Sequence, residues 1–302
     1  MSTKHYPRTV LITGATGNLG AKLIEALART DWCERIVGLD RKVGGAHFSE
    51  RALAKLDLIQ ADLTQTEAHW LHAFKAVDAV IHFAAANPLP DSSWEEALAS
   101  VDMTENVLQA SVLSGVSRFV FASSNHAMGA YKDEPLASQM GPGLLTADLA
   151  PAPGTRWFNG THEVHSLAYG TSKVLSEKIC ATVAQASGGR LSCVSVRVGW
   201  ALTGANDPAQ ISHAGAPTDA ATPSAHDVEA QRNLKWFRDM WLSNADLEGI
   251  FFAALTASEV DWPTPSVVVN GVSANTDSVW DLQSAKVHLG YVPHDNVYRH
   301  VS

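Results

Sequence analysis

Cysteine is scarce in this chain, and long apolar runs are missing from it. Among 302 residues only Cys33, Cys180 and Cys193 are cysteines. Because their number is odd and no CxxC spacing occurs, we expect buried, reduced thiols rather than disulfides or a metal site. No segment approaches the roughly 20 apolar residues that span a bilayer, and the first residues lack the apolar core of a signal peptide. These absences favour a cytoplasmic protein without a bound metal.

Positive charge is also in deficit. The 22 Lys and Arg residues face 31 Asp and Glu residues, which gives a net charge of −9. This balance argues against nucleic acid or an anionic membrane as a partner. A small anionic ligand is still compatible with it, because a few local Arg or Lys residues decide that. Contents of 46% hydrophobic and 18% charged residues are typical of a soluble globular protein.

Short apolar runs alternate with amphipathic stretches through the first two-thirds of the chain. We expect strands at residues 9–13, 35–39, 56–60, 79–83, 119–122 and 191–198. We expect helices at residues 19–30, 66–74, 94–114 and 168–186. Strands that alternate with helices predict an α/β fold with a doubly wound parallel sheet. Ligands of such sheets bind beyond the carboxyl ends of the strands.

The pattern changes after residue 200. Residues 203–231 are rich in Ala, Pro, Ser, Asp and His and show no clear periodicity, so we expect a long, partly irregular loop. Beyond it, helices are expected at 232–242 and 246–257, and a strand at 266–270. We interpret residues 1–200 as the doubly wound domain and residues 201–302 as a small C-terminal region that covers the substrate.

A glycine-rich segment, TGATGNLG, joins the first expected strand to the first expected helix. Glycines at 14, 17 and 20 permit a tight turn, close approach of the backbone to a pyrophosphate, and close packing of helix on strand. The N-terminus of the helix adds unpaired N–H groups and a partial positive charge. The segment therefore predicts a dinucleotide site in a Rossmann-type domain.

Acidic residues stand at the ends of the next two strands. Asp40 can accept hydrogen bonds from both ribose hydroxyls and would repel a 2′-phosphate, which favours NAD over NADP, although Arg41 acts in the opposite direction. A strand-end cap is the alternative role for Asp40. Asp62 and Leu63 follow the third strand, where the chain can contact the adenine.

Tyr169 and Lys173, in the sequence YGTSK, open a long helix. Side chains at i and i+4 share one face, so the phenol and the ammonium point into the same space. The reference pKa of a phenol is about 10, and a nearby ammonium would lower it toward the range of a general base. A strand end with the sequence SSNH lies about 45 residues earlier and adds the hydroxyl of Ser124.

These motifs together resemble the short-chain dehydrogenase/reductase superfamily in its extended form, over about 200 residues. The resemblance implies that Tyr169 donates or accepts a proton, that Lys173 supports it and holds the nicotinamide ribose, and that Ser124 orients the substrate oxygen. It also implies a homodimer formed through helices 94–114 and 168–186. The implied NAD contacts are Gly14, Thr16, Gly17, Asn18, Leu19, Gly20, Asp40, Asp62, Leu63, Ala84, Tyr169 and Lys173.

SSNH, YGTSK and the tail GYVPHDN are most similar to the uronate dehydrogenases, NAD-dependent aldose 1-dehydrogenases that oxidise acidic sugars to lactones. The implied sugar contacts are Asn87, Ser124, Asn125, His126 and Tyr169. Arg232 and Arg238 could bind the acidic group, or could be surface arginines that pack over a Trp-rich core face. The long 203–231 segment and Trp200 depart from that group, so the substrate could instead be another anionic sugar, such as sulfoquinovose or a sugar phosphate.

Two other classes of function fit parts of this pattern. A nucleotide-sugar epimerase of the same superfamily would keep its NAD bound and release no NADH. A dehydratase would need a carboxylate pair where Asn125 and His126 stand. A non-catalytic NAD sensor would be expected to lose part of the Ser–Tyr–Lys set, which this chain retains.

Overall fold

Parallel strands build the central sheet of the computed structural model, which describes residues 6–45, 47–66, 69–158, 162–215 and 226–301. The strand order is β3-β2-β1-β4-β5-β8-β9, and each neighbouring pair is parallel. The strands are β1 Thr9–Thr13, β2 Arg35–Asp40, β3 Leu56–Gln60, β4 Ala79–His82, β5 Arg118–Ser124, β8 Ser192–Val198 and β9 Ser266–Gly271. The predicted doubly wound parallel sheet is confirmed.

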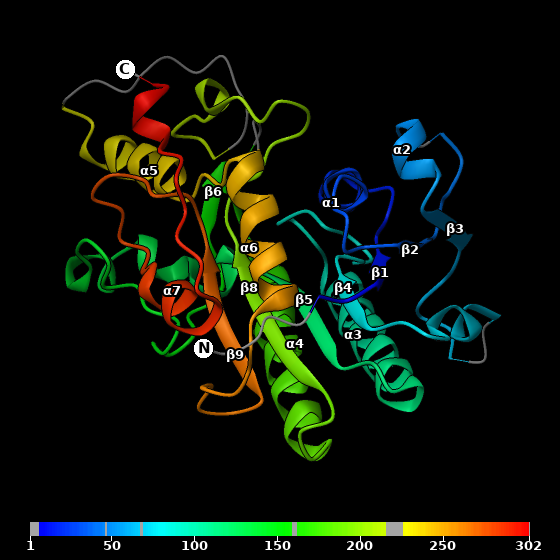
Figure 1. Ribbon diagram of the computed structural model, residues 1–302. Coiled ribbons are helices and arrows are strands. Elements are labelled where there is room, and N and C mark those ends of the chain that lie inside the picture. Colours follow the sequence, from blue (N-terminus) through cyan, green and yellow to red (C-terminus); the bar gives the residue numbers. More distant parts are fainter. Residues whose placement is uncertain (1–5, 46, 67–68, 159–161, 216–225, 302) are drawn as a thin grey trace.

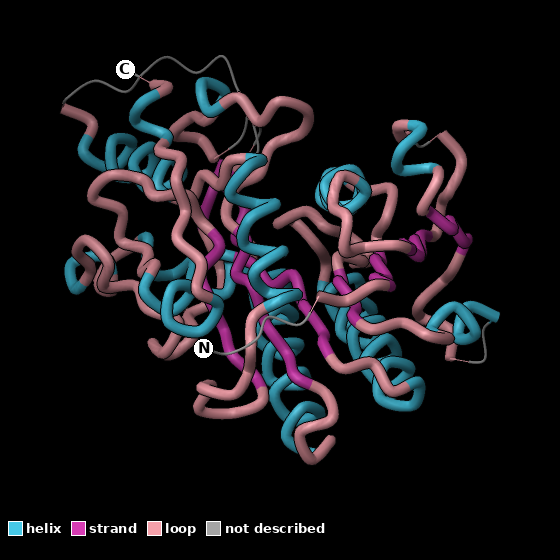
Figure 2. Tube along the Cα trace, viewed as in Figure 1, coloured by secondary structure: helices cyan, strands magenta, loops and turns pink. Residues whose placement is uncertain are grey.

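Helices cover both faces of the sheet (Figures 1 and 2). They are α1 Asn18–Ala28, α2 Glu50–Leu53, α3 Trp94–Ser114, α4 Leu167–Ala186, α5 Val228–Asp239, α6 Asn244–Thr256 and α7 Gln283–Leu289. The short 3-10 helices are η1 His69–Phe74, η2 Asn125–Lys132, η3 Ala137–Gln139, η4 Pro208–Gln210 and η5 Val297–Arg299. Within the described ranges no helix has the length and apolarity needed to cross a bilayer.

Alternate residues of each strand pack into different cores. Val10 and Ile12 of β1 belong to the core on the side of α1 and α6, whereas Leu11 belongs to the core on the side of α3 and α4. Both faces of the sheet are therefore buried, which explains why its strands read as continuous apolar runs. The three cysteines lie in these two cores as buried free thiols, as expected.

Local signals set the ends of the long helices. A capping box of Ser93 and Glu96 begins α3, and Gly115, with φ of 75°, ends it. The expected boundaries 94–114 agree with the structure. The helix expected at 66–74 is a 3-10 helix that begins at His69. The N-cap of α1 is Gly17, which has no side chain to cap the helix, so its first N–H groups have no partner from the cap.

A third core joins the C-terminal part of the chain to the loops that follow β5. It contains Met128 and Leu145 together with Trp236, Phe237 and Trp280. The expected helix 232–242 begins four residues earlier, at Val228, because the side chain of Asp227 accepts a hydrogen bond from the N–H of Ala230. Part of the loop expected at 203–231, residues 216–225, lies outside the described residues.

Candidate active site

A cavity of about 810 Å³ opens at the carboxyl ends of the sheet strands. Most of the residues singled out from the sequence line it. They are Gly14, Thr16, Gly17, Asn18, Leu19, Gly20, Asp40, Asp62, Leu63, Ala84, Ser124, Asn125, His126, Tyr169 and Lys173. Segments that are far apart in the chain therefore meet at one cavity, at the edge of the sheet where ligands of doubly wound folds bind.

The glycine loop has the shape that a pyrophosphate needs. Gly14 has φ of +67°, a conformation that favours glycine, and a Cβ on Gly20 would lie only 2.2 Å from the carbonyl oxygen of Gly14. The turn thus brings the uncapped N-terminus of α1 to the cavity wall. A glycine-rich turn beside a helix N-terminus that no cap side chain occupies fits the diphosphate of NAD.

Asp40 and Asp62 line the cavity together with the glycine loop. The carboxylate of Asp40 accepts hydrogen bonds from the N–H of Thr16 at 2.9 Å and of Lys42 at 3.2 Å. Asp40 thus also caps its strand end, the alternative role considered above. Asp62 accepts the hydroxyl and the N–H of Thr64, and these hydrogen bonds lower the pKa of its carboxyl group.

Tyr169, Lys173 and Ser124 meet in the middle of the cavity wall. Lys173 is buried, its Nζ donates to the carbonyl oxygen of Ala122 at 2.9 Å, and it lies 5.4 Å from the centroid of the Tyr169 ring. A hydrogen bond with Ser124 lowers the pKa of the Tyr169 phenol, but burial outweighs it and the pKa is raised. Burial also lowers the pKa of Lys173 to about 8, against the opposing charge of Glu177.

This balance corrects the expectation that Lys173 by itself lowers the pKa of Tyr169. The ammonium is bound to the end of β5 and lies over the phenol ring, 5.4 Å from its centroid. Desolvation is the largest influence on the phenol, because charged groups lose favourable hydration on burial. Ser124 is the group whose hydrogen bond favours the phenolate.

Asn125 and His126 present defined hydrogen-bonding groups to the cavity. The amide NH2 of Asn125 donates to the carbonyl oxygen of Val198 at 3.1 Å, and its Oδ1 is buried without a partner among the described residues. Asn125 therefore offers an acceptor. Burial lowers the pKa of His126 to about 3, so its imidazole is neutral, and its Nδ1 lies 2.7 Å from the hydroxyl oxygen of Ser166.

Gly170, beside Tyr169, explains how the strand end and the catalytic helix approach each other. A Cβ at this position would lie 2.4 Å from the carbonyl oxygen of His126. Only glycine allows η2 and α4 to pack at this distance, and their contact brings the His126 and Tyr169 rings together. The second residue of YGTSK thus has a steric role that spacing alone did not reveal.

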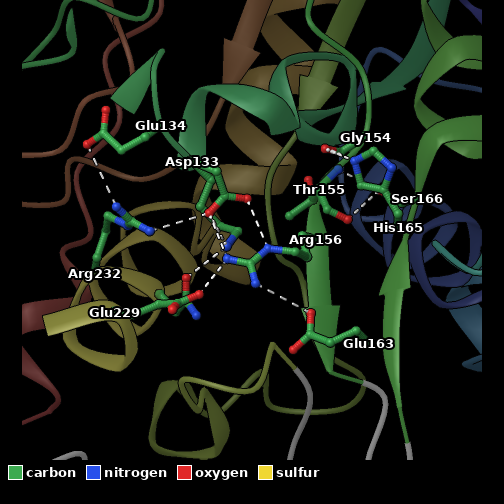
Figure 3. Close-up of polar contacts among 12 residues, drawn as sticks. Asp133, Glu134, Gly154, Thr155, Arg156, Glu163, His165, Ser166, Glu229 and Arg232 are labelled. Atoms are coloured by element: carbon green, nitrogen blue, oxygen red, sulfur yellow. Dashed lines mark hydrogen bonds and ion pairs between the residues drawn. The ribbon is translucent and has the colours of Figure 1, made fainter. Parts of the chain in front are cut away.

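Three expected sugar contacts do not line the cavity, and their assignments need correction. The side-chain amide of Asn87 already has partners: its oxygen accepts from the N–H of Leu89, and its NH2 donates to the carboxylate of Glu96 in α3. Arg232 lies beside two carboxylates, 3.6 Å from Asp133 and 3.8 Å from Glu134 (Figure 3). Helix α5 instead turns Phe237 toward the cavity, and Arg232 and Arg238 do not line it.

Trp157, Trp200 and Phe237 form an aromatic wall of the cavity, with Met240 beside them. Of these residues, only Trp200 was singled out from the sequence, as a departure from the uronate dehydrogenases. Trp157 lies in a hairpin of β6 Arg156–Phe158 and β7 Glu163–His165, which is too short to show periodicity. Its indole N–H is buried without an acceptor among the described residues. The many aromatic residues in 232–242 could have indicated that Phe237 faces a ligand, but the sequence prediction for this helix named only Arg232 and Arg238.

A buried ion pair behind the catalytic residues was also missed. Arg197 and Glu177 are 2% and 6% exposed and form two hydrogen bonds, of 2.9 and 2.8 Å. The hydroxyl of Ser123 donates to the same carboxylate at 2.5 Å. The pair fixes α4 to β8 and β5 next to Lys173. Two features of the sequence could have indicated this ion pair. One is the single arginine in the apolar run 191–198, and the other is the glutamate four residues after Lys173.

Comparison with known proteins agrees with this geometry. Residues 10–213 match the NAD dependent epimerase/dehydratase family. The chain is 31% identical over 288 residues to L-arabinose 1-dehydrogenase (NAD(P)(+)) of Haloferax volcanii, covering 95% of this chain and 96% of the relative. It is 27% identical over 301 residues to uronate dehydrogenase of Pseudomonas putida, covering 98% and 87%.

The fold is shared with solved structures. A uronate dehydrogenase from Agrobacterium tumefaciens, complexed with NAD, superposes with a TM-score of 0.65 at 23% identity, covering 97% of this chain and 86% of that one. A glucuronic acid dehydrogenase from Chromohalobacter salexigens gives 0.65 at 22% identity, covering 96% and 86%. With its glycine loop, parallel sheet and matched length, the chain belongs to the NAD dependent epimerase/dehydratase family, the extended short-chain dehydrogenase/reductases.

Proposed function

We propose that this protein is an NAD-dependent aldose 1-dehydrogenase, which oxidises the C1 hydroxyl of an acidic sugar to the aldonolactone. The observation that carries the proposal is one cavity that holds both the glycine loop and the Ser124, Tyr169 and Lys173 set. Asn125 and His126 add polar groups suited to a polyol. The names of the relatives, an arabinose and a uronate dehydrogenase, point to the same reaction class.

The arrangement of side chains suits removal of a hydride from C1 and of a proton from the C1 hydroxyl. When bound, NAD supplies the acceptor for the hydride that leaves C1. Tyr169 takes the proton of the C1 hydroxyl, and Ser124 holds the same oxygen by a hydrogen bond as the C=O bond of the lactone forms. Lys173, fixed to β5 beside the phenol ring, would hold the nicotinamide ribose. The shared cavity adds catalysis through orientation of the reacting groups.

An acidic sugar is proposed although the two arginines first considered lie elsewhere. Among the described residues that line the cavity, the cationic side chains are Arg41, Lys42 and Lys173. The first two directly follow Asp40, at the dinucleotide end. An anionic group at the sugar end would therefore rely on hydrogen-bond donors, such as the buried indole N–H of Trp157.

The test is a panel of sugars with NAD and with NADP, followed by NADH absorbance. The panel contains glucuronate, galacturonate, sulfoquinovose, glucose 6-phosphate, L-arabinose and glucose. Faster NADH formation with an acidic sugar supports the proposal, and equal rates with neutral sugars remove its acidic part. Conversion of a nucleotide sugar without NADH release would favour an epimerase, and binding of NAD without any turnover would favour a sensor.

The remaining expectations are part of the same proposal. A homodimer through α3 and α4 is supported by exposed apolar side chains on both helices, Leu98 at 54% and Leu175 at 42%. Sedimentation of the wild type and of a Leu98→Lys, Leu175→Lys variant tests it, with a dimer expected for the wild type and a monomer for the variant.

We further propose that residues 1–200 bind NAD, that 201–302 cover the sugar, and that the protein is cytoplasmic.

A further inference from the structure

Ser166 occupies the N-cap of α4, three residues before Tyr169, yet its side chain does not cap the helix. The hydroxyl of an N-cap serine normally accepts a hydrogen bond from the first turn. Ser93 of α3 and Ser243 of α6 do so in this chain. Ser166 is 1% exposed, and its hydroxyl instead contacts His126 and Thr155. The hydroxyl of Ser166 therefore makes contacts beside the cavity in place of a capping hydrogen bond.

The Ser166 hydroxyl has one proton and two acceptors within reach, His126 Nδ1 and the carbonyl oxygen of Thr155. The N–H of Thr155 donates to the hydroxyl oxygen at 2.8 Å (Figure 3). His126 Nδ1 lies at 2.7 Å, a usual length for donation by a hydroxyl, whereas the carbonyl oxygen of Thr155 lies at 3.2 Å. That carbonyl already accepts the backbone N–H of Ser166. The shorter distance favours donation of the Ser166 hydroxyl to His126 Nδ1 over its donation to the Thr155 carbonyl oxygen.

The position of His126 is fixed from several sides. Its carbonyl oxygen accepts the N–H of Gly154 and packs on Gly170 of α4. Its own N–H donates to the hydroxyl oxygen of Ser124 at 3.2 Å. Its ring packs on Tyr169. With Nδ1 bonded to Ser166, the nitrogen left for a ligand in the cavity is Nε2.

We propose that Ser166 is a positioning residue that holds His126 as the neutral Nε2–H tautomer, so that the imidazole donates a hydrogen bond to the substrate. A neutral imidazole that accepts at Nδ1 carries its proton on Nε2. The site then has a fixed polarity, with a donor at His126 and an acceptor at Asn125 Oδ1. A substrate must place an acceptor oxygen, either neutral or anionic, at His126 and a hydroxyl at Asn125.

The tautomer itself can be measured without activity. In the whole protein labelled with 15N-histidine, we expect the His126 signals to show a protonated Nε2 and an unprotonated Nδ1 at pH 7. His126→Gln identifies the signals by their loss. A proton on Nδ1 would overturn the proposal. Because no turnover is involved, this result stands even if the proposed dehydrogenase activity, on which the substrate contact rests, is not found.

The substrate contact is tested by a double-mutant cycle. Ser166→Ala should raise the KM for the sugar about tenfold, the effect of losing one well-aligned hydrogen bond, with kcat within about threefold and NAD affinity unchanged. In the His126→Gln background the same substitution should change KM less than about twofold. Ser166→Thr, which keeps a hydroxyl, should restore most of the affinity.

Ser243→Ala is the matched control, because it removes a capping serine away from the cavity. It should lower the melting temperature and leave KM unchanged. If Ser166→Ala behaves in the same way, or if its effect on KM simply adds to that of His126→Gln, Ser166 has only a structural role and the inference is wrong.

Discussion

The imidazole of His126 packs edge-to-face on the phenol of Tyr169, with ring centroids 5.5 Å apart and an interplanar angle of 84°. One ring follows β5 and the other lies in the first turn of α4. The contact joins the sugar-binding part of the proposed site to its acid–base part. The two parts of the proposed site are thus in direct contact.

Tyr169→Phe should lower kcat by about 10²- to 10⁴-fold, because the proton of the C1 hydroxyl loses its acceptor. NAD affinity, measured by tryptophan fluorescence, should stay within about threefold, since the glycine loop is untouched. Tyr6→Phe, at a residue that is 47% exposed, is the control. Full activity of the Tyr169 variant would remove the acid–base assignment.

Gly20→Ala should abolish measurable NAD binding. The added methyl group would lie 2.2 Å from the carbonyl oxygen of Gly14, so the loop must move out of the shape that suits a diphosphate. Gly44→Ala is the control, because a Cβ there meets nothing within 4 Å. Calorimetric titration with NAD compares the two. Equal affinities would show that this turn does not hold the coenzyme.

Asp40→Ser should raise the use of NADP relative to NAD by at least about tenfold in kcat/KM, which corresponds to about 1.4 kcal/mol. The substitution removes a carboxylate that would repel a 2′-phosphate and leaves Arg41 and Lys42 at the same cavity wall. Asp57→Ser, on the exposed strand β3, should leave the ratio unchanged. A constant ratio in the Asp40 variant would place the ribose elsewhere.

Glu177→Gln should lower the free energy of unfolding by about 3–5 kcal/mol, because it leaves the buried Arg197 without its counter-charge. Arg35→Gln breaks the exposed Arg35–Asp57 pair and should cost less than about 1 kcal/mol. Urea unfolding of both variants gives the comparison. A small loss for Glu177→Gln would mean that water or another group reaches Arg197.

Stability should fall as the pH drops from 7 to 5.5. Burial lowers the pKa of His82 and of His126 to about 3, so both stay neutral when folded but gain protons below about 6.5 when unfolded. The unfolded state then binds more protons, and the loss approaches about 1.4 kcal/mol per pH unit for each histidine. Urea unfolding at several pH values in this range measures the slope. A flat profile would show that these rings are hydrated.

Local patterns in the sequence determined the secondary structure and the fold class of this protein. The strand runs and the helix at 94–114 could be predicted, because alternation and capping depend on neighbours in the chain. Helical geometry also put Tyr169 and Lys173 on one face. The glycine spacing predicted the tight turn after β1, because the absence of a Cβ acts on the backbone of the same residue and its close neighbours.

Only the tertiary structure decided how the side chains are used. Arg232 lies near carboxylates of a distant segment, and Trp157 enters the cavity from a hairpin without a sequence signature. The raised pKa of Tyr169 and the contact of Ser166 with His126 depend on burial and on chain segments far apart in sequence. Periodicity carries information over a few residues, whereas desolvation and side-chain orientation are set by whatever packs alongside.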